Sequence, residues 1–137
     1  MKKNQSFWLA VLAGFTVLAA VDTVIHRIWL GDLYKSLANF WRPSEEMQAN
    51  AWLPFLSEFA LAFLLAVIYP IGREKKPPLE QGLRFGVLMG LLIHLPSILI
   101  KYYLYPYPRF LFAAWFVGGV LEVALAGLAV ALVYQKD

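Results

Sequence analysis

The stretch of sequence that decides the fold is residues 82–103, GLRFGVLMGLLIHLPSILIKYY. Its only charged residues among Asp, Glu, Lys and Arg are Arg84 and Lys101, and both lie close to its ends. About 20 apolar residues cross the hydrocarbon core of a bilayer as a helix, because a backbone in lipid must satisfy its own hydrogen bonds. The stretch therefore predicts a membrane-spanning helix.

Three further apolar runs accompany this stretch, at residues 7–30, 52–71 and 110–134. Each is long enough to span a bilayer, and the alternating ten-residue segments of a membrane β-barrel are absent. We therefore predict an all-α integral membrane protein, a four-transmembrane-helix bundle in which residues 1–137 form a single transmembrane domain.

The composition excludes several other classes of protein. Hydrophobic residues make up 61% of the chain and charged residues 15%, whereas soluble domains have about 45–50% and 25%. A formal net charge of +3 is too small for a nucleic-acid-binding protein. The absence of cysteine excludes disulfides and thiol catalysis. No phosphate-binding loop or nucleophile elbow occurs, so whether the chain is an enzyme stays open.

The distribution of positive charge predicts the orientation in the membrane. The side that holds both termini receives seven Lys and Arg residues and the other side five. The compact turn Arg73–Lys76 carries three of the seven, close to two helix ends where the positive-inside rule is strongest. We therefore expect both termini to face the cytoplasm. The first run also has features of a secretory signal, but it lacks a clean cleavage site before Asp22, so we expect it to be retained.

The segment between the first two runs has an amphipathic pattern. Leu33, Leu37, Phe40 and Trp41 fall on one helical face, and polar residues fall on the opposite face. This spacing predicts a short amphipathic helix on the outer face of the bundle, ended by the Arg42–Pro43 pair. Such a helix would either cap the bundle or contact a partner.

The second and fourth runs resemble each other in sequence. EFALAFL at residues 58–64 aligns with EVALAGL at residues 122–128, and the first and third runs share an Ile-His pair that ends at His26 and His94. The matches indicate two tandem parallel helical hairpins. Because Ala and Leu are frequent in all four runs, chance similarity is the alternative.

Glycines mark the expected helix contacts. Gly82, Gly86 and Gly90 recur every fourth residue, and Gly118 and Gly119 flank Glu122 on the fourth run. Small residues at this spacing allow a neighbouring helix backbone to approach closely. We therefore expect these faces to point toward protein.

Five ionisable side chains interrupt the apolar runs, and every run contributes at least one of them: Asp22, His26, Glu58, His94 and Glu122. An ionised residue at the bilayer centre costs about 2.5–3.5 kcal/mol, so these groups are expected to face the bundle interior. Imidazoles and carboxylates together suit a first-row metal ion such as zinc, iron or manganese, and they also suit a proton relay.

Two other interpretations of the same residues remain. The five groups could be hydrogen-bonded contacts that fix the helix register. Alternatively, His26 and His94 could hold a b-type haem. Nearby carboxylates favour a small ion over haem.

Three segments carry a resemblance to a known group of proteins, namely HRIWLGDLY at residues 26–34, QGLRFG at 81–86 and WFVGG at 115–119. They resemble an uncharacterised family of small bacterial four-span inner-membrane proteins, defined by a domain of unknown function. The resemblance implies a bacterial inner-membrane location and supplies no activity.

Two functional hypotheses follow. In the first, the intramembrane His/carboxylate site binds a metal ion or relays protons for transport or for a membrane-embedded reaction. In the second, the chain is an accessory or structural subunit. Its Gly-rich third run and aromatic outer face would then dock into a homo-oligomer or a larger membrane complex, and the polar cluster would only join helices. The expected partners are therefore the lipid bilayer and other membrane proteins, with no nucleic acid.

Overall fold

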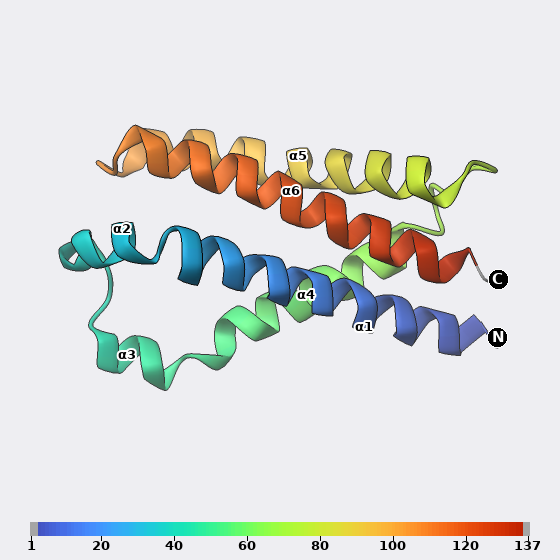
Figure 1. Ribbon diagram of the computed structural model, residues 1–137, viewed down its shortest axis with the longest axis horizontal. Coiled ribbons are helices and arrows are strands. Elements are labelled where there is room, and N and C mark those ends of the chain that lie inside the picture. The colour runs from blue at the N-terminus through green and yellow to red at the C-terminus, as the bar shows by residue number, and fades with distance from the viewer. Residues whose placement is uncertain (1–2, 136–137) are drawn as a thin grey trace.

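The computed structural model describes residues 3–135, and all regular structure in that range is helical. Figure 1 shows long helices lying side by side, with the two chain ends and the α4–α5 connection at one end of the molecule. The long helices are α1 (Lys3–Asp22), α4 (Trp52–Ile68), α5 (Pro78–Leu104) and α6 (Arg109–Tyr134). The predicted all-α class is confirmed for the described residues.

Three of the helices are long and apolar enough to cross a membrane. They are α5, α6 and the continuous helix Asn4–Trp29, which extends α1 through a π-helix, η1 (Thr23–Trp29). The fourth, α4, has 17 residues, and at 1.5 Å per residue it is about 26 Å long, a little under the roughly 30 Å of a hydrocarbon core. Three of the four predicted runs therefore meet the length of a span.

Helix α6 lies at the centre of the packing. It contacts α5 on one side and α1 on the other, and α4 packs mainly on α1. The core between α1, α4 and α6 is built from fully buried side chains such as Leu18, Leu65 and Val130. The Tyr134 hydroxyl donates a hydrogen bond of 2.9 Å to the carbonyl of Ala66 and ties the end of α6 to α4.

Backbone contact joins α5 to α6. Gly82, Gly86 and Gly90 are buried there. A Cβ atom added to Gly86 would lie 2.6 Å from the Cα of Ala124, and one added to Gly127 would lie 2.6 Å from the Cα of Gly86. Only hydrogen atoms fit in this space, so the glycine row lets the two helices pack at their closest distance.

The outer segment differs from the single amphipathic helix predicted for it. The chain forms α2 (Gly31–Ser36), a 3₁₀ turn η2 (Ala38–Phe40) and a further short helix, α3 (Ser44–Ala49). Leu37 interrupts the helix with φ −104° and ψ 20°. This break lets Leu33, Leu37 and Trp41 pack on a second cluster, around Leu30 and Leu111. Tertiary packing of aromatic and aliphatic side chains therefore overrides the continuous helical pattern.

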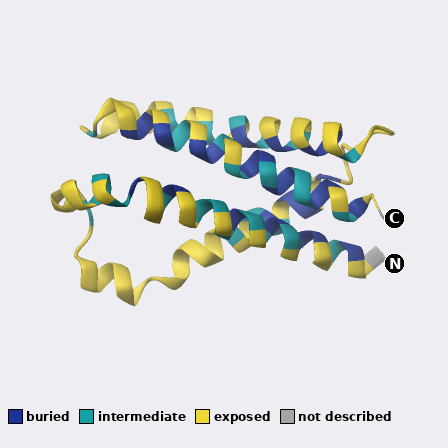
Figure 2. Cartoon of the chain, viewed as in Figure 1, coloured by how far each residue is buried: buried dark blue, intermediate teal, exposed yellow. Residues whose placement is uncertain are grey.

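The outward surfaces of the long helices are strongly apolar. Figure 2 shows α5 exposed along most of its length, with its buried positions on the side that faces α6. Leu92, for example, is 65% exposed and Leu99 is 61% exposed. A contiguous apolar surface of this kind is unfavourable in water and suits lipid.

The α4–α5 connection is charged. Lys76 donates a hydrogen bond to Glu74, with 2.7 Å between Nζ and Oε2, and Arg84 lies 3.7 Å from the same oxygen. The lysine lowers the pKa of the Glu74 carboxyl, so the pair stays charged at neutral pH. This turn therefore lies in a polar environment.

Candidate functional site

The site begins where α1 passes into the π-helix η1. Leu30 N–H donates a hydrogen bond of 2.9 Å to the carbonyl of Ile25, five residues earlier, and the Thr23 hydroxyl donates one of 2.8 Å to Ala19. Short π-helices are rare and occur frequently at functional sites. At this turn Nε2 of His26 lies 3.5 Å from Oδ1 of Asp22.

Two aromatic side chains from other elements hold His26 in place. The Tyr34 hydroxyl, on α2, lies 2.5 Å from Nδ1 of His26 and accepts a hydrogen bond of 2.7 Å from Nε1–H of Trp115 on α6. Burial raises the pKa of Tyr34, so its hydroxyl stays protonated at neutral pH. Neither residue belongs to the set predicted from the sequence.

The roles of these atoms determine the protonation pattern of His26. Indole N–H can only donate, so it occupies one lone pair of the Tyr34 oxygen and leaves the phenolic proton free to donate to Nδ1. A neutral imidazole that accepts at Nδ1 carries its proton on Nε2, which faces Asp22. When His26 is protonated, Nδ1–H instead donates to the second lone pair of Tyr34. Tyr34 can therefore hydrogen-bond both forms of the imidazole.

A small cavity of about 160 Å³ adjoins His26. It is lined by residues from η1, α5 and α6, and its polar members are His26, His94, Lys101 and Glu122. Nζ of Lys101 lies 5.5 Å from the centre of the Trp115 ring, a cation–π contact. A polar cavity of this size has room for several water molecules.

Gly119 makes room for one of the histidines. A Cβ atom at this position would lie 2.6 Å from Nδ1 and 2.7 Å from Nε2 of His94, so the imidazole lies directly over the α6 backbone. Its neighbour Gly118 faces Ile25, whose Cδ1 would lie 3.1 Å from an added Cβ. The two glycines beside Glu122 therefore contact different helices, α5 and η1.

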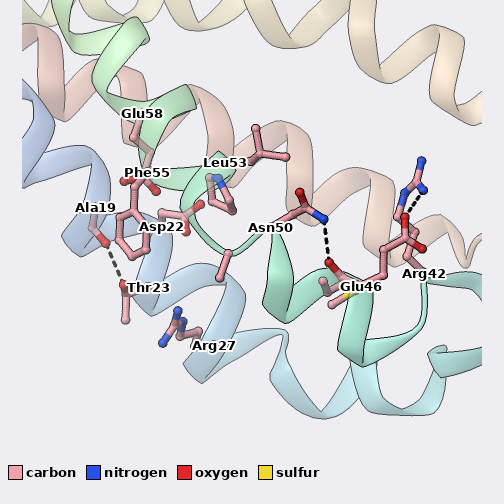
Figure 3. A pocket seen from close by; sticks show the side chains of 13 residues that line it. Ala19, Asp22, Thr23, Arg27, Arg42, Glu46, Asn50, Leu53, Phe55 and Glu58 are labelled. Atoms are coloured by element: carbon pink, nitrogen blue, oxygen red, sulfur yellow. Dashed lines mark hydrogen bonds and ion pairs between the residues drawn. The ribbon is translucent and has the colours of Figure 1, made fainter.

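A larger cleft, of about 650 Å³, lies beside η1 (Figure 3). It is bounded by η1, α3 and the first turns of α4, and it contains Asp22 and Glu58. The carboxyl groups of these two residues interact there. Oε2 of Glu58 is buried and has no hydrogen-bond partner in the described part of the chain. Asp22 faces this cleft and also contacts His26, which lines the small cavity.

The structure divides the five predicted site residues into two groups. His26, His94 and Glu122 line the small cavity, and Asp22 and Glu58 line the cleft. Within residues 3–135, no three His, Asp or Glu side chains are placed so that they could hold a metal ion. At about 160 Å³ the cavity between the histidines is also smaller than the 300–1,000 Å³ of common cofactor sites, so haem does not fit there.

Comparison with known proteins adds no assignment. A scan against protein-family models, a search of curated proteins and a search of solved structures each found no match to this chain. The resemblance to small bacterial inner-membrane proteins therefore stays a prediction.

Removal of the Tyr34 hydroxyl tests the aromatic support of His26. Tyr34→Phe leaves Nδ1 of His26 and Nε1–H of Trp115, both partly buried, without their shared partner, and a fully buried unsatisfied polar group costs about 1–3 kcal/mol. We expect the free energy of unfolding in detergent to fall by about 1–2 kcal/mol. Tyr103→Phe is the matched control, because Tyr103 is 84% exposed. Equal stability of the two variants would contradict the hydrogen-bond network.

Proposed function

We propose that this chain is a small multi-pass membrane protein that relays protons between the cavity and the cleft through Asp22 and His26. The observation that carries the proposal is the position of this pair. His26 lines the small cavity, Asp22 lines the cleft, and 3.5 Å separates Nε2 from Oδ1.

The proposed topology has four spans, with α4 as the short fourth one. The placement of both chain ends and the α4–α5 turn at one end of the molecule supports it. The basic residues of that turn favour a cytoplasmic location for this end, and the resemblance favours the bacterial inner membrane. In this topology α1 with α4 and α5 with α6 form two helical hairpins, and α2, η2 and α3 lie at the outer surface.

The relay uses the two nitrogens of one imidazole. A proton from water in the cavity binds Nδ1 of His26, while the Tyr34 hydroxyl turns from donor to acceptor. The imidazolium then releases its Nε2 proton to the carboxylate of Asp22. Asp22, the ionised member of the Asp22–Glu58 pair, takes up this proton, and Glu58 releases its own proton to water in the cleft, so the pair holds one proton before and after the transfer. The two steps together pass one proton and leave a neutral imidazole protonated at Nδ1, and the ring must return to the Nε2–H form before it takes up the next proton.

His94 and Glu122 serve the cavity end of the relay. Both line the same space as His26, so water there can exchange protons with all three side chains. Lys101 lines the same space, and its positive charge repels further positive charge there. The cavity therefore limits how many protons are held at one time.

Proton flux into liposomes tests this proposal. The purified protein is reconstituted with a pH-sensitive dye inside, and a pH step is applied across the bilayer in the presence of valinomycin and potassium. We expect flux above that of empty liposomes, and His26→Gln should reduce the excess about tenfold because glutamine cannot carry a proton. Tyr103→Phe should retain wild-type flux.

Two outcomes would overturn the proposal. One is a wild-type flux equal to that of empty liposomes. The other is a folded His26→Gln variant with wild-type flux, because the relay has no other group between the cavity and Asp22.

The alternative hypothesis, an accessory subunit that docks into a larger membrane complex, was based on two surface features. The glycine row that was expected to offer a contact surface is buried between α5 and α6. Only the aromatic outer face remains for a larger complex.

A further inference from the structure

The cleft beside η1 has the dimensions of a ligand site. Its volume of about 650 Å³ lies within the 300–1,000 Å³ typical of small-molecule pockets. Figure 3 shows Asp22 and Glu58 at one end of the cleft and the Arg42–Glu46 pair toward the other. The relay described above uses only the carboxyl end and leaves the rest of this space without a role.

The charged groups at one end of the cleft are paired with each other, and those at the other end are not. At its outer end Nη1 of Arg42 lies 2.6 Å from Oε1 of Glu46, so these two charges neutralise each other. At its inner end Asp22 and Glu58 form no ion pair with Arg27, which also lines the cleft, and Oε2 of Glu58 is buried without a hydrogen bond among the described residues. The buried Oε2 therefore lacks a hydrogen-bond donor.

The walls between the two ends are mainly apolar. Leu53, Pro54 and Phe55 from α4 and Met47 from α3 line the cleft. Phe55 is 51% exposed and Met47 is also 51% exposed, so both can cover the body of a bound molecule. An apolar body with one cationic end matches this lining.

A phospholipid from the outer leaflet fits the cleft less well. Its acyl chains extend toward the bilayer centre and its headgroup toward the outer surface. Asp22 and Glu58 lie at the opposite end of the cleft from Arg42 and Glu46 (Figure 3), and in the proposed topology they are the deeper pair in the bilayer. The hydrocarbon of such a lipid would therefore meet the carboxyl groups, and its headgroup would meet the pair that is already neutralised.

We propose that the cleft binds an organic cation, a protonated amine on an apolar body, with its ammonium group between Asp22 and Glu58. The ammonium donates a hydrogen bond to the free Oε2 of Glu58 and replaces the proton that the two carboxyls share. Binding of one R–NH₃⁺ thus releases one proton and leaves two carboxylates around the cation. This proposal goes beyond the proton relay and needs only the cleft.

Binding of a matched pair of ligands tests the proposal. 4-Phenylbutylamine, charged at neutral pH like a lysine side chain, is compared with 4-phenylbutan-1-ol by calorimetry on the full chain in lipid nanodiscs. We expect the amine to bind about tenfold more tightly. Titrations in two buffers of different ionisation enthalpy should show about one proton released with the amine and none with the alcohol.

Variants assign the binding to the carboxyl end. Glu58→Gln should weaken amine binding about tenfold and leave alcohol binding within about twofold. Arg27→Gln should strengthen amine binding, because Arg27 lines the cleft and has no ion pair among the described residues. Glu45→Gln is the control, since Glu45 lies on α3 and does not line the cleft.

The outcomes separate this proposal from the relay. Equal affinity for amine and alcohol, or unchanged amine affinity in both Glu58→Gln and Arg27→Gln, would overturn the cation site. His26→Gln should keep amine affinity within about threefold while it loses proton flux. Loss of flux with intact amine binding therefore leaves the cation site standing, and loss of amine selectivity with intact flux leaves the relay standing.

Discussion

Gly86→Ala is expected to lower the midpoint of thermal unfolding in detergent by roughly 10 °C. The added methyl carbon would lie 2.6 Å from the Cα and 2.7 Å from the carbonyl oxygen of Ala124, and 2.7 Å from that of Val123. Backbone atoms of α6 cannot rotate away as a side chain can, so α5 and α6 must separate. Overpacking costs about 1–3 kcal/mol, and we expect the upper part of that range, which gives the stated shift for a chain of this size.

Gly31→Ala is the matched control for this effect. Apart from its chain neighbours and its own helix backbone, no heavy atom of the described residues lies within 4 Å of the Cβ that it would add, and no glycine among them has a positive φ that alanine would strain. Its midpoint should stay within about 2 °C of wild type. A Gly86→Ala midpoint equally close to wild type would show that the α5–α6 contact is looser than the structure indicates.

Gly119→Leu is expected to expel the His94 imidazole from the small cavity. The Cβ atom of the leucine would already overlap the imidazole ring, because it would lie 2.6 Å from Nδ1 of His94. The leucine then fills a cavity of only about 160 Å³ and displaces its water. We expect proton flux in liposomes to fall more than tenfold, and His94 to react more rapidly with diethylpyrocarbonate.

Gly118→Ala separates this effect from a general disturbance of α6. Its Cβ would meet Cδ1 of Ile25 at 3.1 Å, and this methyl group is the end of a flexible side chain that can move by a few tenths of an ångström. Flux and histidine reactivity should therefore stay near wild type. If Gly119→Leu also keeps wild-type flux, then His94 and the cavity water have no part in proton transfer.

Some residues of the candidate site could be predicted from the sequence, and others could not. Asp22, Glu58 and Glu122 stand out because acidic side chains are rare in apolar runs, and the two histidines stand out for the same reason. Tyr34 and Trp115 do not stand out, because tyrosine and tryptophan near the ends of apolar runs are the normal interfacial anchors. Their hydrogen bond joins residues 81 positions apart, and only packing of α2 against α6 creates it.

The sequence by itself determined the helices, because a chain this apolar must satisfy its backbone within each segment. It also placed at least one ionisable group in each of the four apolar runs. Only the tertiary structure decided which groups meet. Whether two polar groups on different helices meet depends on the rotation of each helix about its axis. Side-chain packing and the η1 turn set that rotation. Asp22 and His26 lie four residues apart on the sequence, yet they line two different hollows, and the relay depends on this arrangement.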